Sequence, residues 1–294
     1  MQSGYSGVVA IGLGLVLSAP VNAQRVLEMP ARTGAGADAL ARGPIAVFWN
    51  PGAVTIPIDR GEAMLMDVRG PSSTGLDGTV IAAALRLDER TTLLAGYQNL
   101  RIDEITRTTT SPLAEDGAVP LDLGENLFAL AAVRTLGPRL ALGAGVQYVR
   151  GAEVAGGENA AEIGAGVSAR IDHSLHPHFG AAVRTADDGA FWIAGLEIAP
   201  DALHRGDWAV RAQYGAGGSP QYHGLSHRVA ASASWRDAAD LSIGFAGEPG
   251  LDGHTWDPVA GVAVRFGRFT VGVLRENLPN DVGAVHAFRL STAF

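Results

Sequence analysis

The sequence predicts a single all-β domain, an antiparallel transmembrane β-barrel of about fourteen strands. Three observations support this fold class. From position 61 onward, apolar residues alternate with small or polar ones in segments of roughly ten residues. Charged residues make up only 18% of the chain and hydrophobic residues 47%. Beyond its N-terminal stretch, the sequence contains no apolar run long enough for a membrane helix.

Residues 1–23 are predicted to be a signal peptide. Val8 to Leu17 form an apolar h-region, and Val21-Asn22-Ala23 places small residues where a signal peptidase reads them. The residues before Val8 include no Lys or Arg, so a retained membrane anchor is the alternative. Because the apolar run is short and interrupted by glycine, we expect cleavage after Ala23 and export of the mature chain.

Successive side chains of a β-strand point to opposite faces, so residues two apart share a face. In residues 161–171 the odd positions are apolar, whereas the even positions carry Glu, Gly, Ser and Arg. The remaining segments follow the same theme, and together they predict a barrel over residues 61–294. The predicted strands are 61–69, 78–87, 91–101, 123–134, 139–150, 159–171, 178–185, 189–198, 206–214, 225–236, 239–247, 256–266, 268–276 and 282–294.

The connections between these segments differ in length. Those after even-numbered segments are mostly short, as at Asp88–Arg90 and at Gly267, whereas those after odd-numbered segments are mostly longer. The largest runs from Ile102 to Asp122. Barrels of the outer membrane have tight turns at the periplasmic end and longer loops outside. The sequence therefore predicts an outer-membrane protein of a diderm bacterium with both termini in the periplasm.

Arginine supplies all 22 basic residues and, within the strands, lies on the parity opposite to the apolar side chains. An arginine on the lipid face at mid-bilayer costs about 2–4 kcal/mol. Glycines share the arginine parity, which favours a narrow lumen over the open surface of a soluble β-sandwich, the alternative fold. The predicted lumen-facing residues, a candidate ligand path, are Arg86, Arg170, Arg184, Arg211, Arg228 and Arg265.

The final segment carries a more specific pattern. Phe288, Leu290 and Phe294 occupy alternate positions, and Phe294 is the last residue. A terminal Phe preceded by alternating apolar residues resembles the signal read by the bacterial barrel-assembly machinery. That machinery is therefore an expected partner during biogenesis, and outer-membrane lipid is the expected surroundings afterwards.

Residues 24–60 are predicted to form a separate segment ahead of the barrel. It contains Phe48-Trp49-Asn50-Pro51, in which Pro51 disfavours a helical conformation at Asn50. This run resembles the A-x-F-W-N-P-A-G segment of the fatty acid channel (FadL-like) superfamily, which includes the PorV and PorQ barrels of a secretion apparatus. Gly52-Ala53 inverts the usual Ala-Gly order. The resemblance covers about thirty residues and the strand number.

The resemblance implies that residues 24–60 form a hatch inside a fourteen-stranded barrel. Trp49 would pack in the lumen, and Asn50-Pro51 would make a turn. The implied function is passive transport of hydrophobic small molecules. The alternative is a PorV-like or PorQ-like role as a scaffold or shuttle for secretion proteins. The insertions that form external binding sites in the superfamily are reduced here, so the resemblance does not specify a substrate.

Other classes of function find little support. The absence of cysteine excludes disulfides and thiolate chemistry, and a net charge of -8 argues against nucleic acid as a partner. His173, His176 and His178 are close in sequence but are expected to lie on a solvated turn rather than to bind metal. Ser226 and His227 are adjacent on a strand and must point to opposite faces. We therefore predict no catalytic residues, no metal and no cofactor.

Overall fold

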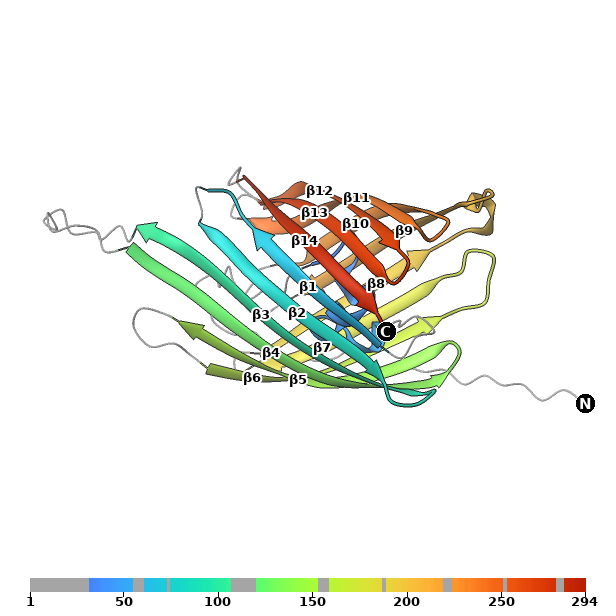
Figure 1. The fold of residues 1–294 in the computed structure, drawn as a ribbon, viewed down its shortest axis with the longest axis horizontal. Helices are drawn as coiled ribbons and strands as arrows, with labels where there is room; N and C mark the ends of the chain where they lie inside the picture. Colours follow the sequence, from blue (N-terminus) through green and yellow to red (C-terminus); the bar gives the residue numbers. More distant parts are fainter. Residues whose placement is uncertain are drawn as a thin grey trace, which may run out of the picture.

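Fourteen antiparallel strands form one closed barrel, which confirms the predicted fold class (Figure 1). The computed structural model describes residues 32–54, 61–72, 75–106, 120–152, 159–186, 189–218, 224–250, 253–278 and 283–294. The predicted signal peptide lies outside these residues. The strands are β1 (Gly61–Arg69), β2 (Leu76–Arg86), β3 (Thr91–Thr106), β4 (Pro120–Gly137), β5 (Leu140–Ala152), β6 (Asn159–Arg170), β7 (His178–Ala186), β8 (Gly189–Ile198), β9 (Trp208–Gly218), β10 (Ser226–Trp235), β11 (Ala239–Gly250), β12 (Gly253–Phe266), β13 (Phe269–Leu278) and β14 (Gly283–Ala293).

Every strand pairs with its neighbours in sequence, and β1 and β14 close the ring. At the closure, the N–H of Gly61 donates to the carbonyl of Phe294 at 2.8 Å, and the N–H of Phe294 donates to the carbonyl of Gly61 at 3.0 Å. Both ends of the barrel sequence therefore lie at the same end of the barrel. Closure leaves no unpaired sheet edge, which a wall surrounded by hydrocarbon requires.

Some strands run further than the sequence predicted. β3 and β4 extend into the polar stretch that was expected to form the largest loop, and residues 107–119 separate them. β11 and β12 likewise leave only residues 251–252 between them. An extended hairpin satisfies the backbone hydrogen bonds of a polar segment as well as solvent does. The expected contrast between a short-turn end and a long-loop end is therefore smaller than predicted, and residues 107–119 account for most of it.

One short connection illustrates how the sequence turns the chain. Arg236 and Asp237 both have positive φ angles, of 49° and 53°. The N–H of Ala238 donates to the carbonyl of Trp235 at 2.8 Å. This is the geometry of a type I′ turn, whose twist matches the twist of the two strands that it joins. The wider connection between β8 and β9 contains a single 3-10 turn, η4 (Asp201–Leu203).

The outer face of the barrel is apolar. Exposed side chains include Leu130, Ile163, Ile243 and Phe288, all on one parity of their strands. Trp256 and Phe266 are both exposed on this surface and lie near opposite ends of β12. Their separation of ten residues spans about 33 Å along the strand, or roughly 23–27 Å along the membrane normal at the usual tilt. This height matches the apolar band of about 25 Å in outer-membrane barrels. Among the described residues, no helix is long and apolar enough to cross a membrane.

Candidate functional site

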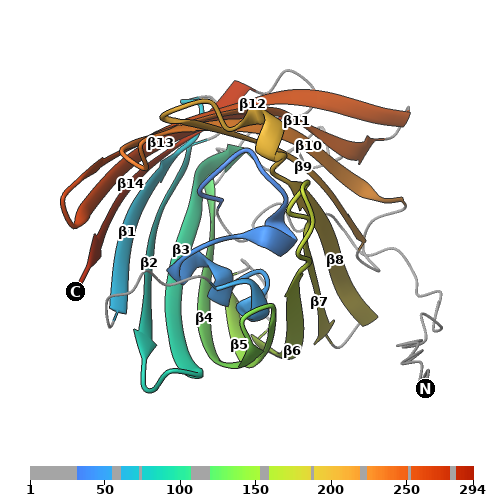
Figure 2. The same cartoon turned by 90° about the vertical axis from the view of Figure 1, so that its right-hand side faces the viewer.

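Residues 32–54, here called the inner segment, lie inside the barrel (Figure 2). The segment contains three 3-10 turns, η1 (Asp38–Leu40), η2 (Pro44–Val47) and η3 (Pro51–Ala53). Proline starts both η2 and η3, where its fixed φ angle suits the first position of a turn and its missing N–H is not needed. Most of the segment from Ala35 onward is buried against the strands.

Asn50 holds the centre of the inner segment. Its backbone is extended, with φ -138° and ψ 95°, and its Oδ1 accepts a hydrogen bond of 3.0 Å from the N–H of Gly52 at the start of η3. Its Nδ2 donates to the carbonyl of Ala39 at 2.7 Å and to that of Val167 on β6 at 3.1 Å. The side chain is fully buried. One amide group therefore joins two turns of the segment to the barrel wall.

Glycines make room for this turn. A Cβ atom at Gly143 on β5 would lie 2.6 Å from the backbone nitrogen of Gly52, and one at Gly166 on β6 would overlap Asn50 Oδ1. A Cβ atom at Gly52 itself would lie 2.6 Å from the Gly166 carbonyl oxygen. The Gly52-Ala53 order therefore places glycine at a position where the backbone lies against the wall and leaves no room for a Cβ atom.

Apolar side chains of the inner segment pack against one side of the lumen. Ile45, Val47, Phe48 and Trp49 are each at most 3% exposed. Burial of one such large side chain contributes about 1.5–3 kcal/mol. The inward parity of β1–β4 is mainly apolar as well, although Glu62, Thr92, Gln98 and Glu125 share it. We call its apolar residues the apolar strip. They are Met64, Met66, Val68, Val80, Ala82, Ala84, Leu94, Leu127, Ala129 and Val133.

The neighbouring strands hold the carbonyls of η2. Gln147 on β5 donates from Nε2 to the carbonyls of Val47 at 3.2 Å and Phe48 at 3.1 Å. Arg184 on β7 donates to the Gln147 side-chain oxygen and lies 3.4 Å from Glu162. Arg184 also stacks over the Phe191 ring at 4.6 Å. These contacts fix the amide of Gln147 in the orientation that serves the inner segment.

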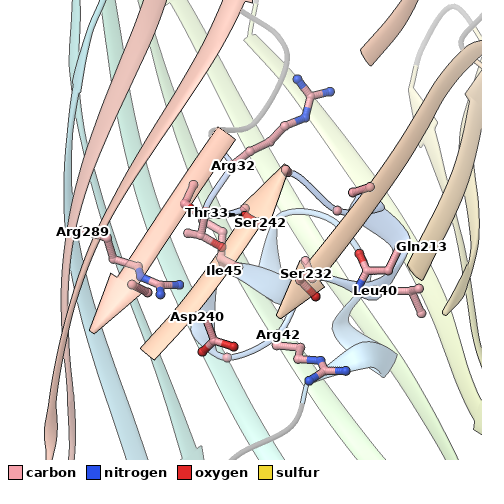
Figure 3. A pocket seen from close by; sticks show the side chains of 18 of the residues that line it. Arg32, Thr33, Leu40, Arg42, Ile45, Gln213, Ser232, Asp240, Ser242 and Arg289 are labelled. Carbon is pink, nitrogen blue, oxygen red and sulfur yellow. Dashed lines mark hydrogen bonds between the residues drawn. The ribbon is translucent and has the colours of Figure 1, made fainter. Parts of the chain in front are cut away.

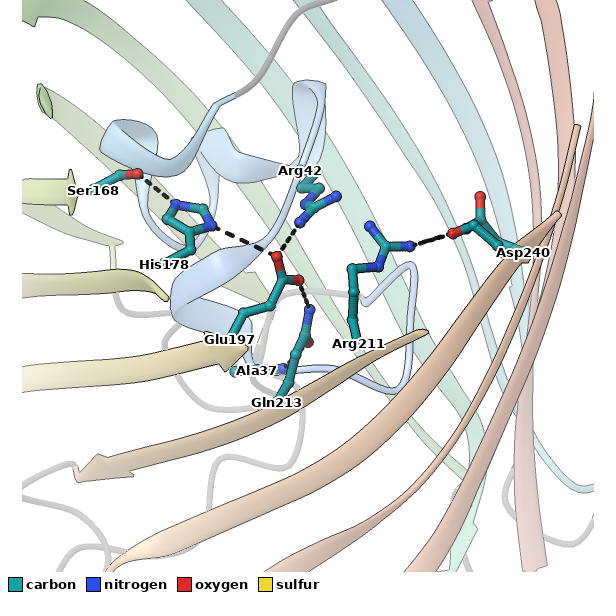
Figure 4. Close-up of polar contacts among 9 residues, drawn as sticks. Ala37, Arg42, Ser168, His178, Glu197, Arg211, Gln213 and Asp240 are labelled. Atoms are coloured by element: carbon teal, nitrogen blue, oxygen red, sulfur yellow. Dashed lines mark hydrogen bonds and ion pairs between the residues drawn. The ribbon is translucent and has the colours of Figure 1, made fainter. Parts of the chain in front are cut away.

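Glu197 on β8 forms a second attachment (Figure 4). Its carboxylate accepts hydrogen bonds from Arg42 of the inner segment and from Gln213 on β9. Gln213 Oε1 in turn accepts the N–H of Ala37 at 3.0 Å. Burial lowers the pKa of the Arg42 guanidinium, and the Glu197 carboxylate opposes this shift.

A third attachment is a cluster of four charged groups. Arg32 bonds to Asp38 at 3.0 Å and to Glu276 on β13 at 3.2 Å. Arg228 on β10 donates to Glu276 and lies 3.7 Å from Asp38. Two arginines and two carboxylates balance one another, as buried charges require. The guanidinium of Arg32 also lies 5.1 Å from the centroid of the Trp49 ring.

A polar cavity of about 430 Å³ separates the inner segment from strands β9–β14 and β1 (Figure 3). The wall of these strands contributes hydroxyls and charges to it, whereas the inner segment contributes glycine and alanine positions together with Arg32, Arg42 and Ile45. The wall residues that face the cavity include Glu62, Arg211, Ser232, Ser234, Asp240, Ser242, Arg265, Thr270, Arg289 and Ser291. The lumen thus has an apolar side filled by the segment and a polar side with free volume.

This barrel with an N-terminal inner segment is similar to several solved channels. The toluene transporter TodX of P. putida superposes with a TM-score of 0.57 at 12% identity, covering 90% of this chain and 99% of TodX. A FadL homologue of Pseudomonas aeruginosa gives 0.55 at 11% identity, with 90% and 98% covered. The toluene transporter TbuX of Ralstonia pickettii gives 0.53 at 13% identity, with 86% and 94% covered.

The chain has the fold of the FadL-type channels. The expected resemblance is therefore confirmed at the level of the fold, which is what identities this low can show. No protein-family model and no curated protein matches the sequence.

Within this FadL-type barrel, the six predicted lumen arginines have different positions. Arg184 and Arg228 belong to the buried networks that hold the inner segment. Arg211 and Arg265 face the cavity, and Arg86 and Arg170 have the inward parity at strand ends. Arg289, which alternation also places opposite the apolar side chains, lines the cavity as well. Glu62, Glu197 and Arg42 were missed, because alternation does not reveal which side chains meet.

Ser168, His178 and Glu197 occupy neighbouring strands in an arrangement similar to a hydrolytic triad (Figure 4). Ser168 Oγ lies 2.7 Å from His178 Nε2, but His178 Nδ1 lies 4.0 Å from Glu197, beyond hydrogen-bond range. Both Glu197 oxygens are held by other donors. The acid therefore does not orient the imidazole as a general base requires.

The histidine cluster corrects one expectation from the sequence. His173 and His176 do lie on an exposed turn, where His176 bonds to Asp201 at 2.7 Å. His178, however, begins β7 and is 3% exposed inside the barrel. Within the described ranges, no group of three or more His, Asp or Glu side chains could hold a metal ion. Ser226 and His227 have separate partners, the Gly217 carbonyl and the Tyr214 hydroxyl.

Proposed function

We propose that the chain is an outer-membrane channel for the passive passage of hydrophobic small molecules. The observation that supports this proposal is the apolar strip on the inner wall. Barrels that conduct water-soluble molecules have polar interiors. Here strands β1–β4 direct methionine, leucine, valine and alanine inward, and the inner segment covers them with Ile45, Val47 and Phe48.

The inner segment would act as the hatch of this channel. When it moves, the apolar strip becomes available to a passenger of similar character. The apolar contacts of Phe48 and Trp49 and the attachments at Asn50, Gln147 and Glu197 would make an unoccupied channel stay closed. A passenger that binds the apolar strip would compensate for the apolar contacts that the segment loses.

The similar solved structures add support, since two of them are described as toluene transporters. We extend that class of passenger to this chain. We propose neither catalysis nor a cofactor for it. Both termini would lie in the periplasm, on the side of the shorter turns. Phe288, Leu290 and Phe294, which are exposed on the outer face of the last strand, would engage the barrel-assembly machinery. No feature of the described residues specifically favours the secretion-scaffold alternative.

Outer-membrane vesicles with lipopolysaccharide in the outer leaflet provide the test, because plain phospholipid bilayers leak hydrophobic molecules. The measurement compares uptake of a labelled monoaromatic hydrocarbon by vesicles with the intact chain, with a chain lacking residues 32–54, and with no added protein. We expect faster uptake with the intact chain than without protein. Equal rates in all three preparations would contradict the proposal.

A further inference from the structure

Arginines on the outer face of the barrel gather on one side, toward the rim that lies away from the C-terminus (Figure 1). Four of them share the parity of the lipid-facing apolar side chains, are exposed, and are here called the arginine arc. They are Arg69 on β1, Arg101 on β3, Arg150 on β5 and Arg275 on β13. Because β1 and β14 are neighbours, these strands form one continuous part of the wall.

The strand register joins three members of the arc into one band. Arg275 pairs with His286, and His286 pairs with Arg69. Arg69 pairs with Asp77, and Asp77 pairs with Arg101. Side chains of paired residues point to the same face of a sheet. Neighbouring strands are about 4.8 Å apart, so Arg69 and Arg101 are separated by roughly 10 Å of wall.

Aromatic and amide side chains beneath the arc indicate its depth. Tyr97 and Phe128 pair on the outer face, with ring centroids 4.9 Å apart. The Tyr97 hydroxyl donates to Asn126 Oδ1 at 2.7 Å, and Asn126 pairs with Arg150. Arg101 is four residues beyond Tyr97 on β3. Aromatic girdles of outer-membrane barrels mark the interface with water, so Arg101 and Arg150 lie at the level of lipid head groups.

The protein supplies few acceptors for this arc. Arg69 bonds to Asp67 at 3.0 Å. Among the described residues, no hydrogen bond or ion pair involves the other three arginines, Arg101, Arg150 and Arg275. Arginine side chains on a lipid-facing wall extend their charged ends toward the interface. Three guanidinium groups therefore have their acceptors in the surroundings of the barrel rather than in its described part.

The opposite side of the same rim is aromatic. Trp192 on β8, Tyr214 on β9 and Trp256 on β12 are exposed on the outer face. Trp256 lies over Gly247, where a Cβ atom would be 3.1 Å from its ring, and stacks with His227 at a centroid distance of 6.3 Å. On the outer face of β6–β12, none of the residues described near this rim is an arginine. The positive charge is therefore confined to one side of the barrel.

We propose that the arginine arc binds the phosphate groups of a lipopolysaccharide molecule in the outer leaflet. The anchor of this lipid has two phosphates on a disaccharide, and arginine donates paired hydrogen bonds to phosphate oxygens. Below the arc, Leu65, Ile81 and Leu130 are exposed to its acyl chains. The inference rests on the proposed topology, in which the rim away from the termini faces outward, but it does not depend on any passenger.

The test measures binding of lipid A, the phosphorylated anchor of lipopolysaccharide, to the full mature chain in detergent by native mass spectrometry. Lipid A without its phosphates is the matched neutral lipid, and phosphatidylglycerol is the competing anionic lipid. The variants that change the arc are R101Q/R150Q/R275Q and R101K/R150K/R275K.

The control variant is R134Q/R139Q/R236Q. It removes the same number of charges from exposed arginines at the opposite rim, where each has a carboxylate partner within 4 Å. The heat-dependent shift in gel mobility that folded barrels show establishes that each variant is folded.

We expect lipid A to bind at least tenfold more tightly than either comparison lipid. One arginine near an anionic lipid surface contributes about fivefold to affinity. The glutamine variant of the arc should therefore weaken lipid A binding at least tenfold, the lysine variant should weaken it less, and the control should bind like the native chain. The inference is overturned if the folded glutamine variant binds lipid A like the native chain, if the control weakens binding equally, or if either comparison lipid binds as well as lipid A.

Hydrocarbon uptake by the native chain, measured in the vesicles described above, separates the two proposals. Uptake without a preference for phosphorylated lipid A would overturn the role of the arc and leave the channel function in place. Arginine-dependent lipid A binding without uptake of any passenger would support the arc and contradict the channel.

Discussion

The methyl group of Ala39 lies 3.4 Å from the position that a Cβ atom would take at Gly195. Ala39 belongs to η1 of the inner segment and Gly195 to β8 of the wall. Disulfides typically have Cβ atoms about 3.5–4.5 Å apart. Because the chain contains no cysteine, a pair introduced at these two positions can form only one intramolecular bridge.

The first prediction uses this bridge to test whether the inner segment moves during transport. In A39C/G195C, we expect oxidation to lower hydrocarbon uptake at least fivefold and reduction to restore it. The two single-cysteine variants serve as controls and should not respond to the oxidant. Equal uptake by the bridged and the reduced protein would show that transport does not require this part of the segment to move.

The second prediction concerns the glycine beneath Asn50. Gly166→Ala places a methyl group where Asn50 Oδ1 lies, so the turn must shift away from β6. We expect a loss of about 1–3 kcal/mol in the stability of the attached segment and faster proteolysis within residues 32–54. Gly124→Ala is the matched control, because the nearest atoms to its added Cβ are 3.8 Å away. The idea fails if both alanine variants are cleaved at the native rate.

The third prediction separates the donor role of Asn50 from its shape. Asn50→Asp keeps the acceptor for the Gly52 N–H but replaces the group that donates to Ala39 and Val167 with a second acceptor. An oxygen facing two carbonyls costs about 1–3 kcal/mol for each lost buried partner. Hydrogen exchange should therefore speed up at the amides of η1 and η3 while those of β10–β12 stay unchanged. Native exchange rates in η1 and η3 would contradict this role.

The fourth prediction concerns the end of the chain. Phe294→Ala removes an exposed outer-face ring but leaves the backbone bonds to Gly61 in place. If the ring is part of the assembly signal, the folded fraction in membranes should fall severalfold, whereas refolding in detergent should remain near native. Phe245→Ala on β11 removes another exposed phenylalanine and should leave both yields unchanged. Equal loss in the two variants would show a general effect of apolar surface.

Alternation, together with the turn residues that separate the segments, was sufficient to predict all fourteen strands and the inward parity of the arginines. It could not predict the apolar strip, because Val80, Ala82 and Ala84 point inward while Ile81 and Leu85 point outward. When both faces of a strand are apolar, the period of two disappears from the sequence. The signal was nevertheless present as an unbroken apolar run in β2, which indicates a strand covered on both sides.

The contacts of the inner segment could not be predicted for a different reason. Arg42 bonds to Glu197, which lies 155 residues further along the chain. Gln147 bonds to Val47, which lies 100 residues earlier. Such pairs depend on how the segment enters the closed ring, and no local pattern in one sequence specifies that. His178 was misplaced because it is the first residue of β7 and directly follows the exposed turn that carries His173 and His176.

The division of the interior into an oily side along β1–β4 and a charged side along β9–β14 constrains how anything can travel through it. A passenger with one apolar and one acidic face has a single favourable orientation about the barrel axis. Turning over midway would place hydrocarbon against guanidinium groups and a carboxylate against methionine. In the proposed channel, such a passenger would therefore keep one orientation throughout its passage, and a symmetric molecule and a two-faced one of equal size should move through at different speeds.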